Sequence, residues 1–269
     1  MKDSSSFSGN KLRTKLSVNL NKVALIRNTR HLENPSVIRS GEICLEAGAH
    51  GLTVHPRPDQ RHIRDQDVIG LSQLLKSWPN CELNVEGNPF HNLMQITDDL
   101  VTRGMPVHQL TFVPDSKDQF TSDAGWNLEQ HGKSLKPLID QVHAWGLRVS
   151  LFMDAEPTLI TFAKDINADR VELYTEPYAS SWGTANQGKE LKRFVLAANA
   201  AIDIGLKVNA GHDLNLKNLK VFSESMPKLE EVSIGHALVS DALEFGFRGT
   251  VARYLNCLGY DLDEKIVSP

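Results

Sequence analysis

The stretch GLTVHPRPDQRH, residues 51 to 62, begins as an apolar, β-branched run and breaks at Pro56 and Pro58. Such a run is typical of a buried strand, and proline does not continue a central strand, so a strand ends here. At its end lie His55 and Arg57, a base that titrates near neutral pH and a cation that binds anions through paired hydrogen bonds. In an isolated loop such residues are usually only solvated. A functional interpretation therefore depends on the arrangement recurring elsewhere in the chain.

Eight short apolar runs of this kind are spaced along the sequence. They cover residues 15–21, 51–56, 82–87, 109–114, 148–154, 170–176, 206–212 and 231–236. Segments with helical spacing lie between them, at 35–49, 65–78, 133–145, 158–166, 190–204 and 216–225. Gly48, Gly146 and Gly205 are placed to end three of these helices. Eight alternating units predict an α/β fold, the (β/α)8 or TIM barrel with a parallel eight-stranded core.

Length and composition fit one globular domain. The chain has 269 residues, of which 41% are hydrophobic and 23% charged, which suits a single barrel. The first residues are polar, serine-rich and without hydrophobic periodicity, and they lack the apolar core of a secretion signal. We therefore expect a flexible tail at residues 1–14 and one catalytic barrel domain over residues 15–269.

Charge and hydropathy exclude several classes of partner. The net charge of −4 gives no general attraction to nucleic acid, so any phosphate must be bound by a local site. No window approaches the roughly 18 apolar residues of a membrane span, so no membrane partner is expected. Cys44, Cys81 and Cys257 lie far apart and leave one unpaired, which argues against a disulfide framework and favours a reducing, cytoplasmic location.

The carboxyl ends of all strands share one mouth in this fold, and catalytic groups lie there. The predicted strand ends carry acids, bases and amides: Asn19, Asn21, His55, Arg57, Glu86, Asp154, Glu172, Asn209, His212 and His236. Any one of them could be an ordinary loop residue, but so many converging on one mouth predict a catalytic site. Glu86 and Glu172 follow apolar residues, and partial burial would raise their pKa towards the range of proton transfer near neutrality.

The last two predicted strands end in glycine followed by histidine. These ends are NAGH at 209–212 and SIGH at 233–236, and each precedes a helix-like segment. Backbone N–H groups and helix N-termini bind anions, and the loops after strands 7 and 8 are the usual phosphate site of the barrel. Gly-His alone is a weak motif, so the prediction of a phosphorylated substrate depends on its position in the fold.

Eight segments together resemble the pyridoxine 5′-phosphate synthase family. They are VNLNKVALIRNTR (18–30), GLTVHPRPDQRHIRDQDV (51–68), ELNVEGNP (82–89), FVPDSKDQFTSDAGW (112–126), VSLFMDA (149–155), VELYTEPYA (171–179), GLKVNAGHDLN (205–215) and SIGHALVSDAL (233–243). The pattern HxRxDxRHIxDxDV, from His55 to Val68, is highly specific to that family, and the resemblance covers residues 16–258. It implies a barrel enzyme that condenses 1-deoxy-D-xylulose 5-phosphate with 3-amino-2-oxopropyl phosphate, releasing inorganic phosphate and water. It also implies no metal, no organic cofactor and assembly into a homo-octamer.

The resemblance further implies a role for each matching residue. The general acid/base set would be His55, Glu86 and His212, with Glu172 stabilising charge. Asn19 would contact the amino-ketone phosphate, and the deoxyxylulose phosphate would be held by Arg30, Arg57, His62 and Thr121. Gly235 and His236 would complete the phosphate loop. Amine attack, dehydration and ring closure are proton transfers, which need several acids and bases more than one strong nucleophile.

Three positions depart from the family's pattern. The family usually has Asp-His where this chain has Asn21 and Lys22, and glycine where it has Asp213. All three residues are still candidates for substrate binding. Lys22 would bind phosphate as a point charge, whereas Asn21 lacks a carboxylate that could orient a substrate amine or hydroxyl. Asp213 would disfavour a phosphate unless it points away or caps the following helix.

Three other functions fit parts of the sequence. A barrel lyase or aldolase would need a Schiff-base lysine, and the nearest candidate, Lys207, begins its strand instead of ending it. A metal hydrolase could be built on His55 and His62, although no third ligand follows at a fixed spacing. The departure at Asn21 and Lys22 also fits a diverged barrel that binds a phosphorylated ligand without turnover. Turnover assays separate these alternatives.

Overall fold

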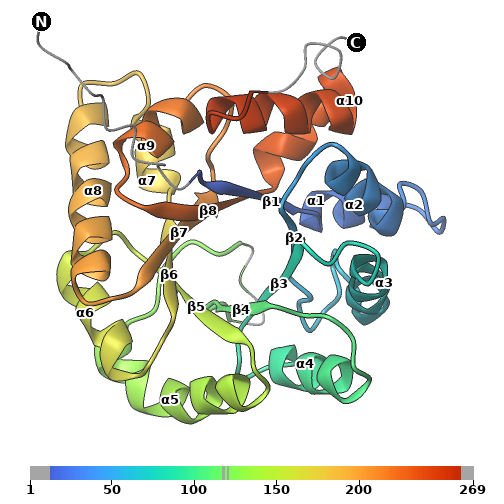
Figure 1. Ribbon diagram of the computed structural model, residues 1–269, viewed down its shortest axis with the longest axis horizontal. Helices are drawn as coiled ribbons and strands as arrows, with labels where there is room; N and C mark the ends of the chain where they lie inside the picture. The colour runs from blue at the N-terminus through green and yellow to red at the C-terminus, as the bar shows by residue number, and fades with distance from the viewer. Residues whose placement is uncertain (1–12, 117–118, 120, 262–269) are drawn as a thin grey trace, which may run out of the picture.

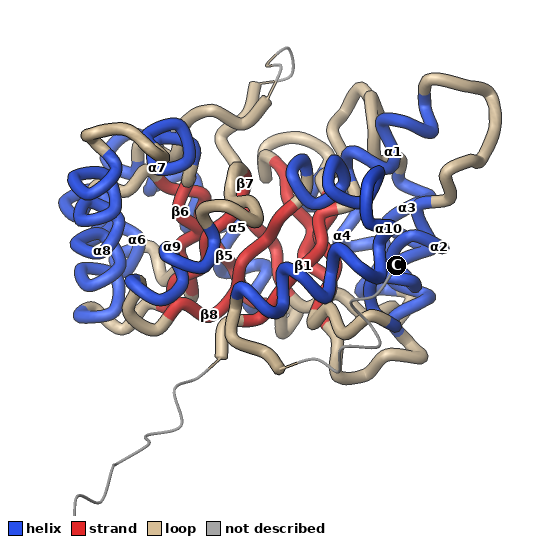
Figure 2. The backbone as a smooth tube through the Cα atoms, turned by 90° about the horizontal axis from the view of Figure 1, so that it is seen from above, coloured by secondary structure: helices blue, strands red, loops and turns tan. Residues whose placement is uncertain are grey.

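A computed structural model of the protein describes residues 13–116, 119 and 121–261, and these form a closed barrel of eight parallel strands (Figure 1). Each strand pairs with its neighbours in sequence, and β1 closes the barrel against β8. In the view turned by 90°, the strands occupy the centre and helices lie on both sides of them (Figure 2). The predicted (β/α)8 fold is confirmed.

The strands of the barrel coincide with the eight predicted runs. They are β1 (Lys15–Asn19), β2 (Gly51–Val54), β3 (Glu82–Gly87), β4 (Gln109–Phe112), β5 (Arg148–Met153), β6 (Arg170–Tyr174), β7 (Lys207–His212) and β8 (Leu229–Ile234). The differences lie at the strand ends. The run at 15–21 was predicted too long, because the chain already turns into a helix at Asn21.

The described helices surround this barrel. They are α1 (Asn21–Asn28), α2 (Val37–Glu46), α3 (Asp65–Leu75), α4 (Leu93–Thr102), α5 (Leu128–Ala144), α6 (Pro157–Asp165), α7 (Glu176–Ser181), α8 (Gln187–Asp203), α9 (Leu219–Ser225) and α10 (His236–Cys257). The six segments with helical spacing correspond to α2, α3, α5, α6, α8 and α9. Gly48, Gly146 and Gly205 follow their helices with φ of +99°, +78° and +82°, the left-handed conformation that ends a helix.

Alternate residues of each strand face opposite sides of the barrel wall. The outward-facing residues, such as Leu52 and Val54, are apolar and join the core under the helices. The inward-facing residues are largely polar. Thr111 of β4, for example, donates to Glu172 of β6 at 3.4 Å, across the interior. Barrels of this fold are usually filled by branched apolar side chains. In this protein, polar side chains continue from the mouth into the interior of the barrel.

The start of the described chain is tied to the barrel. The Thr14 hydroxyl donates to the carbonyl of Leu229 at 3.0 Å, and the Arg13 guanidinium lies 5.3 Å from the ring centroid of Tyr260. The rest of the predicted tail, residues 1–12, lies outside the described residues. Among the helices of the described part, none is long and apolar enough to cross a membrane.

Candidate active site

Three adjacent strands deliver the central acid and base of the mouth. Asn19 ends β1, His55 directly follows β2, and Glu86 lies near the end of β3. The Asn19 amide donates to Oε2 of Glu86 at 3.3 Å, and Nδ1 of His55 lies 4.0 Å from the same oxygen. His55 and Glu86 are 5% and 9% exposed, so both face the interior of the protein instead of solvent. The convergence expected from the strand ends is present for these three residues.

Burial keeps His55 in its neutral form. Desolvation lowers the pKa of His55 well below its ordinary value, and the nearby Arg57, His62 and His212 lower it further. An unprotonated imidazole accepts a proton at one ring nitrogen. His55 is therefore in the state that a general base requires at neutral pH.

The two carboxyl groups are shifted in the opposite direction. Burial raises the pKa of Glu86 to about 7, a direction that the charge of nearby Asp115 reinforces. Burial also raises the pKa of Glu172 well above its ordinary value, and the charges of Glu86 and Glu231 add to the effect. The expected rise of both pKa values is confirmed. A carboxyl poised near neutrality both donates and accepts protons there.

At the end of β7, His212 forms a pair with the residue that follows it. Nδ1 of His212 lies 2.9 Å from Oδ2 of Asp213. Burial lowers the pKa of His212, but the hydrogen bond and charge of Asp213 outweigh burial, so that the pKa lies above its ordinary value. His212 also has a φ of +79°, which is unusual for a residue with a side chain. This histidine is suited to donate a proton, in contrast to His55.

The expected helix cap at Asp213 is wrong. The next helix, α9, begins only at Leu219, so Asp213 is too far from its first turn. The intervening turn is instead held by Asn218, whose side chain accepts the N–H of Asn215 at 2.8 Å. Asp213 remains at the mouth, where its charge acts on His212.

Gly211 has a packing function beside Glu172. A Cβ at Gly211 would lie 2.3 Å from the carbonyl oxygen of Ser233 and 3.2 Å from Oε1 of Glu172. Only glycine fits this position between β6 and β8 without displacing the buried carboxylate. The glycine before His212 is therefore needed for close packing as well as for any exposed N–H groups.

Asn21 and Lys22 begin α1, directly above the end of β1. The side-chain oxygen of Asn21 accepts the backbone N–H of His55 at 2.8 Å, which fixes the end of β2. The amide thus provides an acceptor at the position where the family usually has a carboxylate. The charge of Lys22 lowers the pKa values of both His62 and His212.

The long loop between β4 and α5 returns to the mouth and contacts Arg57. One nitrogen of the Arg57 guanidinium donates to the carboxylate of Asp115, and another donates to the carbonyl of Gln119 at 2.7 Å. The loop is anchored at its far end by Trp126, whose indole N–H donates to the carbonyl of Phe112 at 2.9 Å. Gly125 allows this return, because a Cβ there would lie 2.2 Å from the backbone nitrogen of Asp154.

His62 lies beside His55, with 6.2 Å between the two ring centroids. Its Nδ1 accepts the N–H of Ile63 at 2.9 Å, and burial, followed by the charge of Arg57, lowers its pKa to about 4. The ring is therefore neutral near pH 7, with its other nitrogen protonated. A neutral N–H donor of this kind is a suitable ligand for a phosphate oxygen.

Arg27 holds the segment around His62 in place. This fully buried residue of α1 pairs with the carboxylate of Asp67 through both terminal nitrogens and donates to the carbonyl of His62 at 3.1 Å. The neighbouring Asn28 donates to the same carbonyl at 2.8 Å. Arg27 does not lie at a strand end, so the sequence argument did not name it. It positions the backbone of His62 through these hydrogen bonds.

The end of β8 has the geometry expected of an anion site. Gly235 is followed directly by His236, the first residue of the long helix α10. A Cβ at Gly235 would lie 3.1 Å from the side chain of Asn19, so this glycine brings the β8 loop against the β1 end. The helix N-terminus and its N–H groups therefore adjoin Asn19.

Three other predicted residues are exposed. Arg30, Thr121 and His236 lie at the surface of the described structure. Lys207 begins β7 at the opposite end from His212, and its Nζ lies 3.4 Å from Glu230. It therefore has no access to the mouth as a Schiff-base residue.

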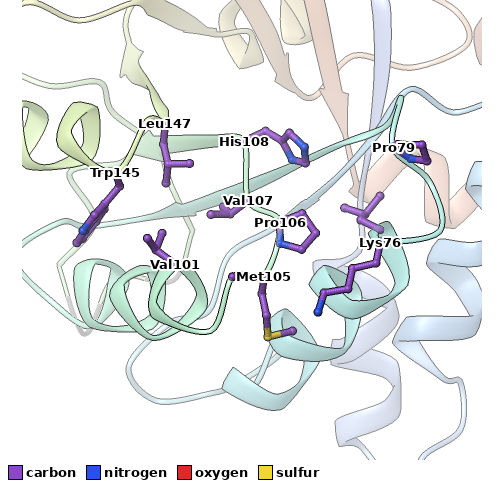
Figure 3. A pocket seen from close by; sticks show the side chains of 11 residues that line it. Lys76, Pro79, Val101, Met105, Pro106, Val107, His108, Trp145 and Leu147 are labelled. Atoms are coloured by element: carbon purple, nitrogen blue, oxygen red, sulfur yellow. The ribbon is translucent and has the colours of Figure 1, made fainter.

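A hollow of about 480 Å³ lies at the other end of the barrel (Figure 3). It is lined by residues from the segments that precede β4 and β5, including Pro106, His108 and Leu147. Because these are amino ends of strands, the hollow is separate from the acids and bases described above. Across the described residues, no group of three or more His, Cys, Asp or Glu side chains is arranged to hold a metal ion.

Asp115 is the mouth residue that the sequence argument missed. It is 3% exposed, and its Oδ2 lies 4.0 Å from Nε2 of His55. The residue stands immediately after the apolar run at 109–114. Reading the end of that run in the same way as the other strand ends would have identified it.

Solved structures with the same architecture are only distantly related in sequence. Tryptophan synthase from M. tuberculosis superposes with a TM-score of 0.63 at 11% identity, covering 93% of this chain and 94% of the matched chain. Thiamine phosphate pyrophosphorylase from Pyrococcus furiosus gives a TM-score of 0.56 at 12% identity, covering 96% of this chain and 98% of its own. At such identities the likeness shows the fold alone.

Sequence relatives are much closer. A protein named pyridoxine 5′-phosphate synthase from Albidiferax ferrireducens is 61% identical over 245 residues, which cover 91% of this chain and 97% of the relative. A protein of the same name from Bacteroides thetaiotaomicron is 46% identical, covering 91% and 99%. The family model described as pyridoxal phosphate biosynthesis protein PdxJ matches residues 16–260. With a match that spans the whole barrel, this chain belongs to the PdxJ family of pyridoxal phosphate biosynthesis proteins.

Proposed function

We propose that this protein is a pyridoxine 5′-phosphate synthase of vitamin B6 biosynthesis. It would condense 1-deoxy-D-xylulose 5-phosphate with 3-amino-2-oxopropyl phosphate to form pyridoxine 5′-phosphate, inorganic phosphate and water. The observation that carries the proposal is the buried group of His55 and Glu86, in which a neutral base lies 4.0 Å from a carboxyl group with a pKa of about 7. The family membership supports the same activity.

The proton transfers are divided among four residues. Neutral His55 and the ionised form of Glu86 take protons from the attacking amine and from the carbon next to the one that loses its hydroxyl group. His212, whose pKa is raised by Asp213, gives a proton to a departing hydroxyl or to a substrate oxygen. Glu172 lies below them in the barrel. In its ionised form, Glu172 stabilises the positive charge that develops on the nitrogen-containing intermediate. Opposite pKa shifts in one site allow acid and base steps at a single pH.

Substrate binding is assigned to the rim of the mouth. Asn19, Gly235 and His236 would bind the amino-ketone phosphate, because the β8 loop and the start of α10 meet the end of β1 there. The deoxyxylulose phosphate would be held by Arg30, Arg57, His62 and Thr121, and Asn21, Lys22 and Asp213 would make further substrate contacts at the mouth. Arg30, Thr121 and His236 are exposed and would reach the substrate from the edge of the mouth.

The same proposal extends to the assembly and location of the protein. We propose a homo-octamer in the cytoplasm, with one catalytic barrel domain in each chain. The reaction consists of proton transfers and phosphate loss, which the acids, bases and anion-binding groups of the mouth suit.

Turnover of the two phosphorylated substrates tests the proposal. Purified protein should consume both and release pyridoxine 5′-phosphate and inorganic phosphate, detected by mass spectrometry and by a phosphate assay. Omission of either substrate should abolish product formation. Tight binding of one substrate with no product from the pair would instead support a barrel that binds phosphorylated ligands without turnover.

A further inference from the structure

The loop between β4 and α5 brings a buried carboxylate into the mouth that has no role in the scheme above. Oδ2 of Asp115 accepts hydrogen bonds from the guanidinium of Arg57 and from the hydroxyl of Ser122, the latter at 2.7 Å. Oδ1 of Asp115 is buried and has no hydrogen-bond partner among the residues that the structure describes. If Asp115 only fastened the loop, a buried oxygen without a partner would be an unfavourable way to do so.

Asp115 also lies on the far side of the imidazole from Glu86. Nδ1 of His55 is 4.0 Å from Oε2 of Glu86, and Nε2 is 4.0 Å from Oδ2 of Asp115. The Asp115 oxygen that faces His55 is the one that holds Arg57. One negative charge thus lies between the cation and the base.

We propose that Asp115 is a positioning residue for the reaction: its carboxylate fixes the guanidinium of Arg57 at the mouth and offsets the charge of that guanidinium at His55. With the carboxylate in place, Arg57 faces a phosphorylated substrate without depriving His55 of its ability to take a proton. The inference rests on the proposed function for its kinetic test, and a second measurement does not need turnover.

The surroundings of His55 explain why this offset matters. Besides Asp115 and Glu86, the charged and titratable groups around its ring are Arg57, Arg61, His62 and His212. After desolvation, these four groups are the factors that lower the pKa of His55. If one of the two nearby carboxylates were lost, less negative charge would offset the positive charges around the His55 ring. The pKa of His55 would then fall further.

Asp115→Asn is the decisive variant, because the amide keeps the shape of the side chain and an acceptor for Arg57 but removes the charge. The acid limb of the kcat/KM profile reports the protonation of the free enzyme's bases, and the negative charge of Asp115 favours the protonated form of both His55 and Glu86. We therefore expect the limb to move down by about one pH unit, and a titration of the His55 ring identifies the part of the shift that belongs to His55. On the plateau, kcat/KM should fall by about tenfold or more, since Arg57 loses its charged anchor. Asp115→Glu should restore the wild-type position of the limb.

Two variants of the same loop serve as controls. Ser122→Ala removes the other hydrogen bond to Oδ2 without removing charge, and Asp123→Asn removes a charge from an exposed position of the loop. Neither should move the acid limb. Titration of the His55 ring by NMR in the wild-type protein and in Asp115→Asn should show the same downward shift of the pKa without any substrate.

The two measurements separate failure of the inference from failure of the proposed function. If the wild type makes no product while the His55 titration still shifts in Asp115→Asn, the function is wrong and the electrostatic inference stands. If the His55 titration stays in place in a folded Asp115→Asn protein, Asp115 only supports the loop and the inference is overturned, even if the acid limb moves through Glu86.

Discussion

Glu86 has the strongest individual case for a chemical role. Its carboxyl is buried, its Oε2 accepts from Asn19 and lies near His55, and its pKa is raised to about 7. Glutamine has nearly the same shape and reach but neither takes nor gives a proton. We expect Glu86→Gln to lower kcat by about 10² to 10⁴ with the fold intact.

Steady-state kinetics with circular dichroism as a check of folding tests this expectation for Glu86. The exposed Glu129→Gln, in the first turn of α5, is the matched control and should retain activity. Activity of Glu86→Gln within a few-fold of the wild type would remove Glu86 from the proposed acid/base set.

Lys22 is the departure from the family pattern with the clearest physical consequence. Lysine binds phosphate as a point charge, whereas histidine is the side chain suited to proton exchange near neutral pH. A contact made equally in the ground and transition states affects binding alone. We therefore expect Lys22→Met to raise KM for a phosphorylated substrate several-fold more than it lowers kcat.

Separate measurement of kcat and KM for each of the two substrates decides the role of Lys22. Lys133→Met, an exposed lysine of α5, should change neither value. A fall in kcat at unchanged KM would mean that Lys22 acts in a chemical step. Restoration of Asp-His at positions 21 and 22 should leave the identity of the product unchanged.

At the scale of secondary-structure elements, the amino ends of three even-numbered strands, β2, β4 and β6, share one hydrogen-bonding arrangement, called here the device. The residue just before β2, β4 and β6 accepts the backbone N–H of the second residue of the preceding strand. The pairs are His50 with Leu16 at 3.2 Å, His108 with Leu83 at 3.0 Å, and Asp169 with Val149 at 2.7 Å. In the two histidines the acceptor is Nδ1, which must be unprotonated to do this.

The histidine members of this device make the barrel sensitive to acid. Burial lowers the pKa of His108, an effect that nearby Glu82 opposes and Arg148 and Lys15 support. A base with a lowered folded-state pKa contributes stability that is present above its unfolded pKa, about 6.5, and is lost as the pH falls below it. The contribution of His108 to the free energy of unfolding should therefore decrease from pH 7 to pH 5.

His108→Asn tests this sensitivity, because the asparagine side chain offers an acceptor at every pH. The variant should lose fewer degrees of melting temperature than the wild type between pH 7 and pH 5, with a difference of about 2 to 4 °C. His31→Asn, at an exposed histidine, should follow the wild type. Equal losses in all three proteins would show that protonation of His108 does not limit acid stability.

At the scale of the whole molecule, the anion site exists only when the barrel is closed. Its proposed parts come from strands at opposite ends of the sequence: Asn19 from β1, Arg57 and His62 after β2, and Gly235 after β8. A ligand that binds only the folded state stabilises it by mass action, by about 2.7 kcal/mol at a hundred times its dissociation constant.

Inorganic phosphate at millimolar concentration should therefore raise the melting temperature by several degrees over sodium chloride of equal ionic strength. Arg57→Met should reduce this rise. Arg248→Met, at an exposed arginine of α10 that pairs with Glu46, should keep it. If phosphate leaves the melting temperature unchanged and the Gly235→Val variant keeps full activity, the phosphate loop is misassigned.

The sequence by itself determined the barrel, because its evidence is local and repeated. Each strand is a short apolar run, and three of the helices end at a glycine in the left-handed conformation. The strand ends also identified Glu86 and His55, since position in the fold decides which residues face the mouth. The sequence argument did not name α1, α4, α7 and α10, although α4 buries Leu93, Ile96 and Leu100 at the spacing of one helix face.

Only the tertiary structure decided how these residues act on one another. The pair of His212 with Asp213, the amide of Asn21 on the backbone of His55, and the carboxylate of Asp115 depend on loops that return to the mouth. The opposite pKa shifts of His55 and Glu86 follow from burial and from charges far away in sequence. Residue types and strand periodicity are local properties of the chain, whereas desolvation and charge proximity arise only when distant segments pack together.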